Sequence, residues 1–239
     1  NLMQQEVYNR HIKHFSKHWW FQARKKIIES ILIKNTYKKK IKILDFGSGS
    51  GVNIKMLSKF GDVSIFEPNK IAKSYLKQKY KGEKYSIIRD YKNKKFDLIV
   101  LADVLEHIKN DKFIVKKLHK NLDKKGFILI TVPAYSLLFS QKDKILKHYR
   151  RYSKIEIINI FKKFKIIKLT FFNFFLFLPI SSIIILMKIF NINFIDTVEK
   201  SPNKIINFIL YYMFVSEIKL INLFNLPFGL SILGLFQKK

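Results

Sequence analysis

The chain has 239 residues, enough for one domain with a substantial core. It contains no cysteine, which excludes disulfide bonds, thiolate zinc sites and a cysteine nucleophile. The formal net charge of +29, from 46 Lys and Arg against 17 Asp and Glu, has two interpretations: an anionic partner, or compositional drift toward lysine, isoleucine and asparagine.

The first 34 residues have helical spacing and predict one or two helices ahead of a sheet. Residues 1–40 are expected to form a helical lid, with Trp20 as a candidate substrate contact. His11, His14 and His18 fall on nearly one helical face, but no carboxylate accompanies them, so no metal site is expected. No basic and then apolar leader opens the sequence given, and the expected location is the cytoplasm, or the inner face of the membrane.

From Ile41 onward, apolar runs alternate with helical patterns, as in βαβ units. Strands are expected at residues 41–46, 63–66, 85–88, 96–101 and 127–132, and helices at residues 53–60, 69–80 and 109–122. Parallel neighbours need crossover connections, and the crossovers cover both faces of the sheet. Five such strands therefore predict an α/β fold with a parallel, doubly wound sheet.

The first strand runs directly into a glycine-rich turn, in which Asp45 precedes Gly47, Gly49 and Gly51. A dinucleotide fingerprint needs a third glycine where Val52 stands, and a phosphate loop needs a lysine followed by Ser or Thr, so the turn fits neither. An acid at this place would repel a pyrophosphate and attract a cationic ligand.

Acidic residues follow the next strands as well. Glu67, after the second strand, stands where a carboxylate can accept ribose hydroxyls, and Asp90, after the third, is placed to accept from an adenine amino group. Asp103 follows the fourth strand. Because the carboxyl ends of parallel strands meet at one edge, the sequence predicts a site for an adenosine that carries a positive centre and no phosphate.

The motifs LDFGSGSG, FEPN, IRD and FDLIVLADVLEHI, in this order over about residues 41–132, resemble those of class I S-adenosylmethionine-dependent methyltransferases. The resemblance extends to a small-molecule, ubiquinone-biosynthesis-like branch through HWWF-x-x-R, H-x-R-R-Y and PFGLS segments. It implies S-adenosylmethionine as cofactor and a Rossmann-like sheet of about seven strands, the last of which, at residues 229–239, runs antiparallel. The cofactor contacts that it implies are Asp45, Gly47, Ser48, Gly49, Gly51, Glu67, Pro68, Asp90, Tyr91, Ala102, Asp103, Val104 and His107.

Residues 134–153 are expected to form an irregular insert that serves as a substrate lid on a core at residues 41–172. His148 is the candidate general base because imidazole titrates near neutrality. Anchoring the lid is the other interpretation of His148, and Glu106 and His107 are alternative bases. The candidate substrate contacts of the lid are Tyr135, Arg150 and Arg151, of which the arginines suit a phosphate or carboxylate.

Ser153 with Glu156 predicts a capping box that opens a helix to Phe164, and residues 166–172 predict a sixth strand. Residues 173–228 are expected to form a hydrophobic helical insertion. The window at 171–187 is the most apolar of the chain, and a membrane span, a helix in the bilayer interface and a packed hairpin are its three interpretations. The segment 204–224 is expected to be a poor span because it contains Glu217 and Lys219.

The expected activity is methyl transfer to an oxygen or nitrogen of a small, apolar or lipid-linked acceptor, with peripheral contact to an anionic membrane. The segment Ala102-Asp103-Val104-Leu105 lacks the Asn/Asp-Pro-Pro-aromatic motif of base-amine methylation, so a nucleic-acid substrate is not favoured. Two alternatives stay open: an RNA methyltransferase, which the charge supports, and a non-catalytic protein that binds S-adenosylmethionine.

Overall fold

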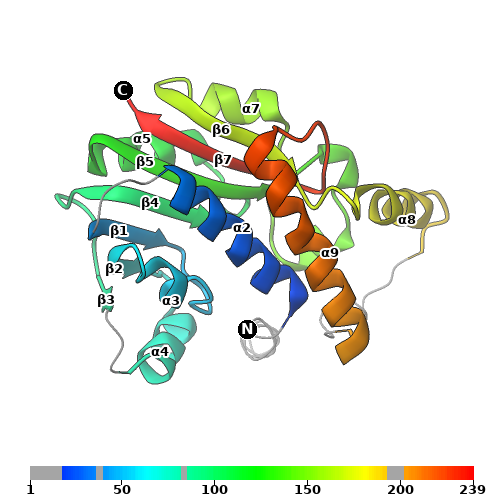
Figure 1. Ribbon diagram of the computed structural model, residues 1–239, viewed down its shortest axis with the longest axis horizontal. Coiled ribbons are helices and arrows are strands. Elements are labelled where there is room, and N and C mark those ends of the chain that lie inside the picture. The colour runs from blue at the N-terminus through cyan, green and yellow to red at the C-terminus, as the bar shows by residue number, and fades with distance from the viewer. Residues whose placement is uncertain (1–17, 36–39, 82–84, 193–201) are drawn as a thin grey trace.

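A seven-stranded sheet forms the centre of the computed structural model, which describes residues 18–35, 40–81, 85–192 and 202–239 (Figure 1). His11, His14 and any helix before residue 18 lie outside the described residues. The strand order is β3-β2-β1-β4-β5-β7-β6. The strands are β1 (Ile41–Phe46), β2 (Gly61–Phe66), β3 (Tyr85–Ile87), β4 (Phe96–Ala102), β5 (Leu122–Pro133), β6 (Phe164–Phe172) and β7 (Ser231–Lys238).

The first five strands are parallel to one another, whereas β7 runs antiparallel between β5 and β6. This arrangement confirms the predicted Rossmann-like class with its antiparallel last strand. The central strands β1 and β4 are nearly continuous runs of buried apolar residues, such as Ile43, Leu44 and Val100, because helices cover both faces.

On one face lie α2 (Trp19–Asn35) and α9 (Lys204–Leu223), and on the other lie α5 (Asp111–Asn121) and α7 (Lys154–Ile160) (Figure 1). The remaining helices are α3 (Ile54–Leu57), α4 (Lys70–Lys79), η1 (Leu105–His107), η2 (Ser136–Leu138), α6 (Gln141–Ile145) and α8 (Phe177–Ile189).

Three local predictions were wrong in extent. The helix expected at residues 53–60 is one turn, α3, because β2 already begins at Gly61. The helix after Ser153 has the predicted capping box but ends at Ile160, since β6 begins at Phe164. The insert at 134–153 is not irregular, because it contains η2 and α6, and a second capping box between Ser140 and Asp143 starts α6.

The helices α2 and α9 run side by side in the same direction, since Trp19 contacts Asn207 near their starts and Lys34 contacts Asn222 near their ends. Aromatic rings join them to the sheet: the Trp20 ring lies 5.2 Å from Phe214 and 6.1 Å from Phe172, centroid to centroid. Trp20, the candidate substrate contact, is thus part of the packing between α2, α9 and β6.

By length and composition, α9 is long and apolar enough to cross a membrane, and its most apolar window is 17% buried in the fold. By these two criteria alone, α9 differs from the expectation that residues 204–224 make a poor span. The window at 171–187 is divided, since Phe171 and Phe172 belong to β6 and the helix that follows, α8, has 13 residues. Glu217 does not face solvent, because it is fully buried and accepts a hydrogen bond from the Phe175 amide.

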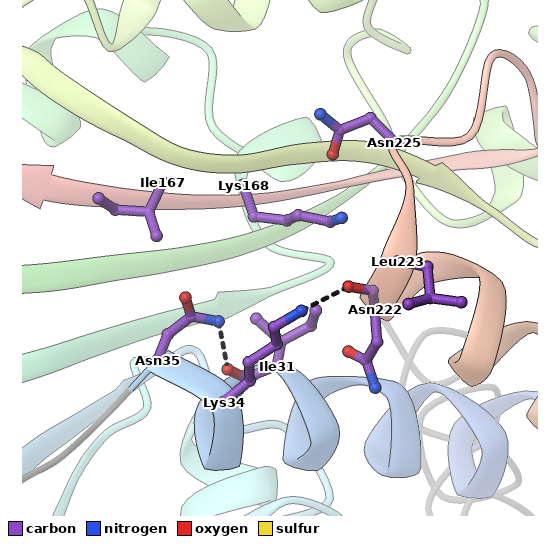
Figure 2. A pocket seen from close by; sticks show the side chains of 8 residues that line it. All are labelled: Ile31, Lys34, Asn35, Ile167, Lys168, Asn222, Leu223 and Asn225. Carbon is purple, nitrogen blue, oxygen red and sulfur yellow. Dashed lines mark hydrogen bonds between the residues drawn. The ribbon is translucent and has the colours of Figure 1, made fainter.

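A cavity of about 240 Å³ opens where α2 and α9 end beside β6 (Figure 2). The Lys34 ammonium donates to the Asn222 carbonyl at 2.6 Å, and the Lys168 ammonium donates to the Phe224 carbonyl at 2.7 Å. Lysine side chains at a helix C-terminus satisfy carbonyls that the helix leaves unpaired. These lysines therefore cap the end of α9 and do not mark a ligand site.

Candidate functional site

The glycine turn between β1 and α3 has left-handed backbone at Gly47, Gly49 and Gly51, with φ of +74°, +56° and +73°. A Cβ at Gly51 would lie 2.6 Å from side-chain atoms of Ile54 and Leu76, so packing also requires glycine there. A Cβ at Gly49 would meet no atom of the described residues within 4 Å. Gly49 therefore exposes its backbone to open space, where a ligand can approach closely.

Asp45 lies at the base of this turn and is 2% exposed. Its carboxylate accepts a 2.6 Å hydrogen bond from the Ser48 hydroxyl. Burial raises the pKa of Asp45 to about 6, the Ser48 bond opposes this rise, and nearby Glu67 adds to it. The site thus holds a buried acid whose ionised form a cationic ligand would stabilise.

Glu67, at the end of β2, ties the turn to the second strand. One carboxylate oxygen accepts from the Gly49 amide and the other from the Asn69 amide, both at 2.8 Å. Burial raises the pKa of Glu67, and the two amides oppose this rise. Each oxygen has a further lone pair for ligand hydroxyls.

Three aromatic rings pack together around Phe66, the residue before Glu67. The Tyr91 ring packs edge-on against Phe46 at 5.3 Å and Phe66 at 4.9 Å. Asp90 is exposed, and its side chain accepts from the Lys92 amide at 2.9 Å. Pro68 is also exposed, between Glu67 and the start of α4.

Asp103 follows β4 in left-handed backbone, with φ of +56°. The Thr131 hydroxyl donates to its carboxylate at 2.6 Å, and the Arg24 guanidinium of α2 forms an ion pair with it. Val104 packs under the turn, because a Cβ at Gly47 would lie 2.9 Å from its side chain. Ala102, the last residue of β4, is half-buried.

Sequence reasoning missed Arg24 as a site residue. Its side chain is 4% exposed, and desolvation lowers its pKa to about 10 against the pull of Glu106 and Asp45. The only signal was its place in the HWWF-x-x-R segment. The structure brings this arginine to the carboxyl ends of β1 and β4, where it offsets the charge of the acids.

Glu106, His107 and His148 form a cluster beyond Asp103. One potential ligand atom from each lies within 4.8 Å of the others. The two imidazole rings meet edge-on, 4.6 Å apart. Glu106 is 1% exposed, its Oε2 has no hydrogen-bond partner among the described residues, and burial raises its pKa to about 8.

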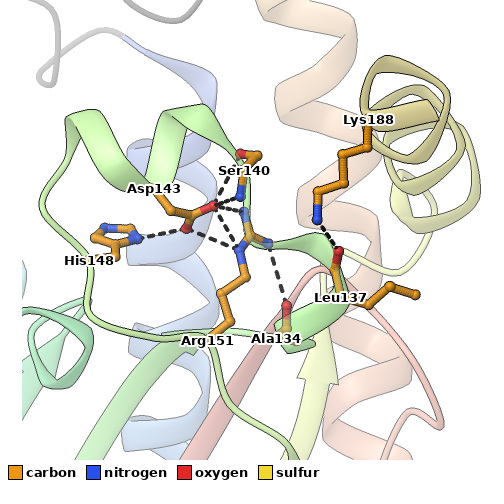
Figure 3. Close-up of polar contacts among 7 residues, drawn as sticks. All are labelled: Ala134, Leu137, Ser140, Asp143, His148, Arg151 and Lys188. Atoms are coloured by element: carbon orange, nitrogen blue, oxygen red, sulfur yellow. Dashed lines mark hydrogen bonds and ion pairs between the residues drawn. The ribbon is translucent and has the colours of Figure 1, made fainter. Parts of the chain in front are cut away.

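Asp143 on α6 is the centre of the lid (Figure 3). It accepts from the Ser140 amide at 2.8 Å, from the Arg151 guanidinium at 2.9 Å, and lies 2.8 Å from His148 Nδ1. Desolvation acts to raise its pKa, but the bonds from His148 and Arg151 outweigh this and hold the pKa well below its usual range. Asp143 was not among the predicted site residues.

The other predicted substrate contacts of the lid also have partners within the chain. Arg150 pairs with Asp111 at 3.2 Å and donates to the Lys109 carbonyl at 2.7 Å. The Tyr135 ring stacks on Phe171, with centroids 5.2 Å apart. These contacts support the interpretation that the arginines anchor the lid, whereas substrate binding by them stays a prediction.

The site as a whole fits the cofactor that the motifs imply. Gly49 leaves backbone accessible beside two buried acids, Asp45 and Glu67, where a diphosphate would be repelled and a sulfonium or ammonium attracted. The individual contacts to the adenine and ribose stay predictions.

The methyltransferase-domain family matches residues 14–169 of the chain. A curated relative, the ubiquinone biosynthesis O-methyltransferase of Pelagibacter ubique (strain HTCC1062), is 28% identical over 137 residues. That match covers 51% of this chain, and the chain spans only 57% of the relative's length.

Solved structures show the same fold at low sequence identity. The plantazolicin methyltransferase BpumL, in complex with a monoazolic desmethylPZN analog and S-adenosylhomocysteine, is 14% identical with a TM-score of 0.59, covering 98% of this chain and 90% of its own. The N-methyltransferase NodS from Bradyrhizobium japonicum WM9, in complex with S-adenosylhomocysteine, is 15% identical with a TM-score of 0.50, covering 63% of this chain and 78% of its own.

Proposed function

This chain belongs to the methyltransferase-domain family of class I S-adenosylmethionine-dependent enzymes, and from this premise we propose that it methylates an oxygen or nitrogen of an apolar or lipid-linked small molecule. The observation that carries the cofactor assignment is the pair of hydrogen bonds that the Gly49 and Asn69 amides donate to the Glu67 carboxylate. They fix the glycine turn and the acid of β2 as one rim.

When bound, the cofactor supplies an electrophilic methyl group on a sulfonium. Asp45 would balance positive charge on the cofactor's amino-acid part, and Glu67 would accept its ribose hydroxyls. Tyr91 and Asp90 would contact the adenine edge. The chain then has to align the acceptor and exclude water, and residues 134–153, which the Asp143 contacts hold together, would do both as a lid.

The proposal of an apolar or lipid-linked acceptor rests on the exposed apolar side chains of α8 and α9. Their exposed apolar side chains include Leu178, Ile183, Leu186, Ile189, Ile205, Phe208, Ile209 and Tyr212. Exposed apolar side chains in this number on two helices indicate a binding surface for a membrane or an apolar partner. Lys188 of α8 donates to the Leu137 carbonyl of η2 at 2.5 Å, so this surface adjoins the lid (Figure 3).

We place the protein at the inner face of an anionic membrane, where exposed lysines such as Lys204 and Lys219 flank the apolar surface. The ubiquinone O-methyltransferase relative supports a lipid-linked acceptor. The net charge of +29 supports the competing proposal of an RNA acceptor.

One transfer experiment separates these proposals. The full chain is incubated with S-adenosylmethionine labelled in its methyl group, together with bacterial lipid extract in vesicles and total RNA. We expect label in the organic phase, and much less of it after Glu67→Ala when the cofactor concentration is below its dissociation constant for the unchanged chain. Label that nuclease digestion releases would replace the lipid acceptor with RNA. Cofactor binding with no label in either fraction, across a panel of phenols and amines, would indicate a non-catalytic protein.

A further inference from the structure

The cluster of Glu106, His107 and His148 has the composition of a cation site. These three side chains offer one carboxylate oxygen and two imidazole nitrogens, and the ligand atoms all lie within 4.8 Å of one another. Ligands on one zinc-type ion lie about 3 to 3.5 Å apart, given bond lengths of about 2.1 Å. Small side-chain rotations would therefore bring all three onto one ion.

Glu106 gives an independent sign that this cluster binds a cation. Its carboxylate is 1% exposed, and Oε2 lacks a hydrogen-bond partner among the described residues. A buried carboxylate oxygen without a partner is costly, and a cation would remove that cost. The surrounding charges permit a cation, because the two guanidiniums that act on the pKa of Glu106, those of Arg24 and Arg151, are paired with Asp103 and Asp143.

Both imidazoles have hydrogen-bond partners within the chain. His148 Nδ1 lies 2.8 Å from Asp143, which orients the ring and leaves Nε2 free to coordinate. His107 makes a hydrogen bond to the backbone at Leu146 and Lys147. Metal-binding histidines characteristically have such a carboxylate or carbonyl partner, which fixes the tautomer. His107 is also exposed, so an ion can enter from solvent.

We propose that Glu106, His107 and His148 bind one divalent cation of the zinc, cobalt or manganese type. A set of two imidazoles and one carboxylate suits these ions better than magnesium, which prefers oxygen ligands. The sequence alone did not predict a metal here, because 41 positions separate His107 from His148. In this arrangement His148 is a metal ligand and not a free base.

Three protein ligands leave a coordination position open. The role of this position rests on the proposed methyl transfer: the position would receive a hydroxyl oxygen of the acceptor, whose proton, made more acidic by the cation, would pass to solvent. The oxygen would then form the bond to the methyl group as the methyl–sulfur bond breaks and S-adenosylhomocysteine leaves. The cation site itself does not depend on this role, and it is tested by binding alone.

The test is titration of the chelator-treated full chain with Zn²⁺ alone, read by calorimetry, and with Co²⁺ alone, read by its visible absorption. We expect one bound ion per chain, and a loss of affinity of more than about tenfold in Glu106→Gln and in His148→Ala. His119→Ala, on α5 and outside the cluster, is the matched control and should bind as the unchanged chain does.

Circular dichroism and S-adenosylhomocysteine binding show whether each variant is folded. Unsaturable binding, or equal binding by the unchanged chain and by folded Glu106→Gln and His148→Ala, would overturn the proposal. Because cofactor binding is measured on the same samples, a failed metal site and a failed methyltransferase assignment are distinguishable. If the site holds, removal of the ion should lower turnover while leaving cofactor affinity unchanged.

Discussion

Arg24 of α2 and Asp103 at the end of β4 form an ion pair across 79 positions of sequence, and the arginine is almost fully buried. The pair fastens the helix that precedes the sheet to the carboxyl end of a central strand. The same guanidinium lies close enough to Glu106 and Asp45 for each to act on its pKa. One arginine thus offsets the charge of three acids around the candidate cofactor site.

Breaking this pair from the arginine side should destabilise the fold. Removing one partner of a buried ion pair leaves the other charge without compensation. Because Asp103 is 24% exposed, we expect Arg24→Met to lower the free energy of unfolding by about 2 kcal/mol. Urea unfolding of Arg24→Met, Asp103→Asn and the double variant forms a double-mutant cycle. Additive losses in that cycle would mean that the two side chains do not interact energetically.

Glu67→Ala should weaken S-adenosylhomocysteine binding by about 2 kcal/mol, roughly thirtyfold, because it removes the acceptor of ribose hydroxyls and releases the Gly49 amide. Isothermal titration measures the change. Asp62→Asn, which alters an exposed acid on the same strand, is the control. Equal affinity of Glu67→Ala and the unchanged chain would remove Glu67 from the cofactor site.

The glycine turn should respond differently at two of its positions. Gly51→Ala combines left-handed backbone strain with side-chain overlap at 2.6 Å and should cost about 2 to 4 kcal/mol of stability. Gly49→Ala carries only the backbone strain, about 1 kcal/mol, because its Cβ would enter open space. Thermal unfolding compares the two, and a larger loss of stability in Gly49→Ala would contradict the described turn.

Asp45 should make stability depend on pH. Burial raises its pKa from 3.8 to about 6, so between these values the folded state binds a proton that the unfolded state releases. Ionised Asp45 therefore subtracts stability above about pH 6, by at most about 3 kcal/mol, and this cost disappears below about pH 4.

The Asp45→Asn variant has no carboxylate to ionise at this position, so its stability does not carry that cost. Its stability relative to the unchanged chain should accordingly rise from about pH 4 to about pH 7 in urea unfolding. Its S-adenosylmethionine affinity should be weaker near neutrality, where ionised Asp45 attracts the cation. A pH-independent difference in stability between the two proteins would rule out the shifted acid.

Membrane contact should depend on the exposed apolar faces of α8 and α9. Changing Leu186 and Ile209 together to Glu should lower co-sedimentation with anionic vesicles about tenfold or more, since each side chain is more than half exposed. Ile155→Glu on α7, across the sheet and 71% exposed, is the matched control. Equal sedimentation of all three proteins would remove these faces from any membrane contact.

The sequence predicted the sheet well, for a local reason. The strand at Ile41–Phe46 has the predicted bounds, and Glu67 meets the glycine turn at the Gly49 amide, whereas the cofactor contacts themselves stay predictions. Strands are recognised from short apolar runs, and parallel connections then bring their carboxyl ends to one edge. The order of motifs along the chain was therefore enough to determine the fold class and the candidate cofactor.

Only the tertiary structure decided which side chains from distant segments meet. The pairing of Arg24 with Asp103, the position of Asp143 between His148 and Arg151, and the meeting of Glu106 with both histidines all join separate segments. Glu217, one of the two charges for which the segment was expected to be a poor span, is fully buried on α9. Hydrophobic periodicity reports which face of an element is buried, but it carries no information about which distant side chain lies opposite, because packing between elements sets that choice.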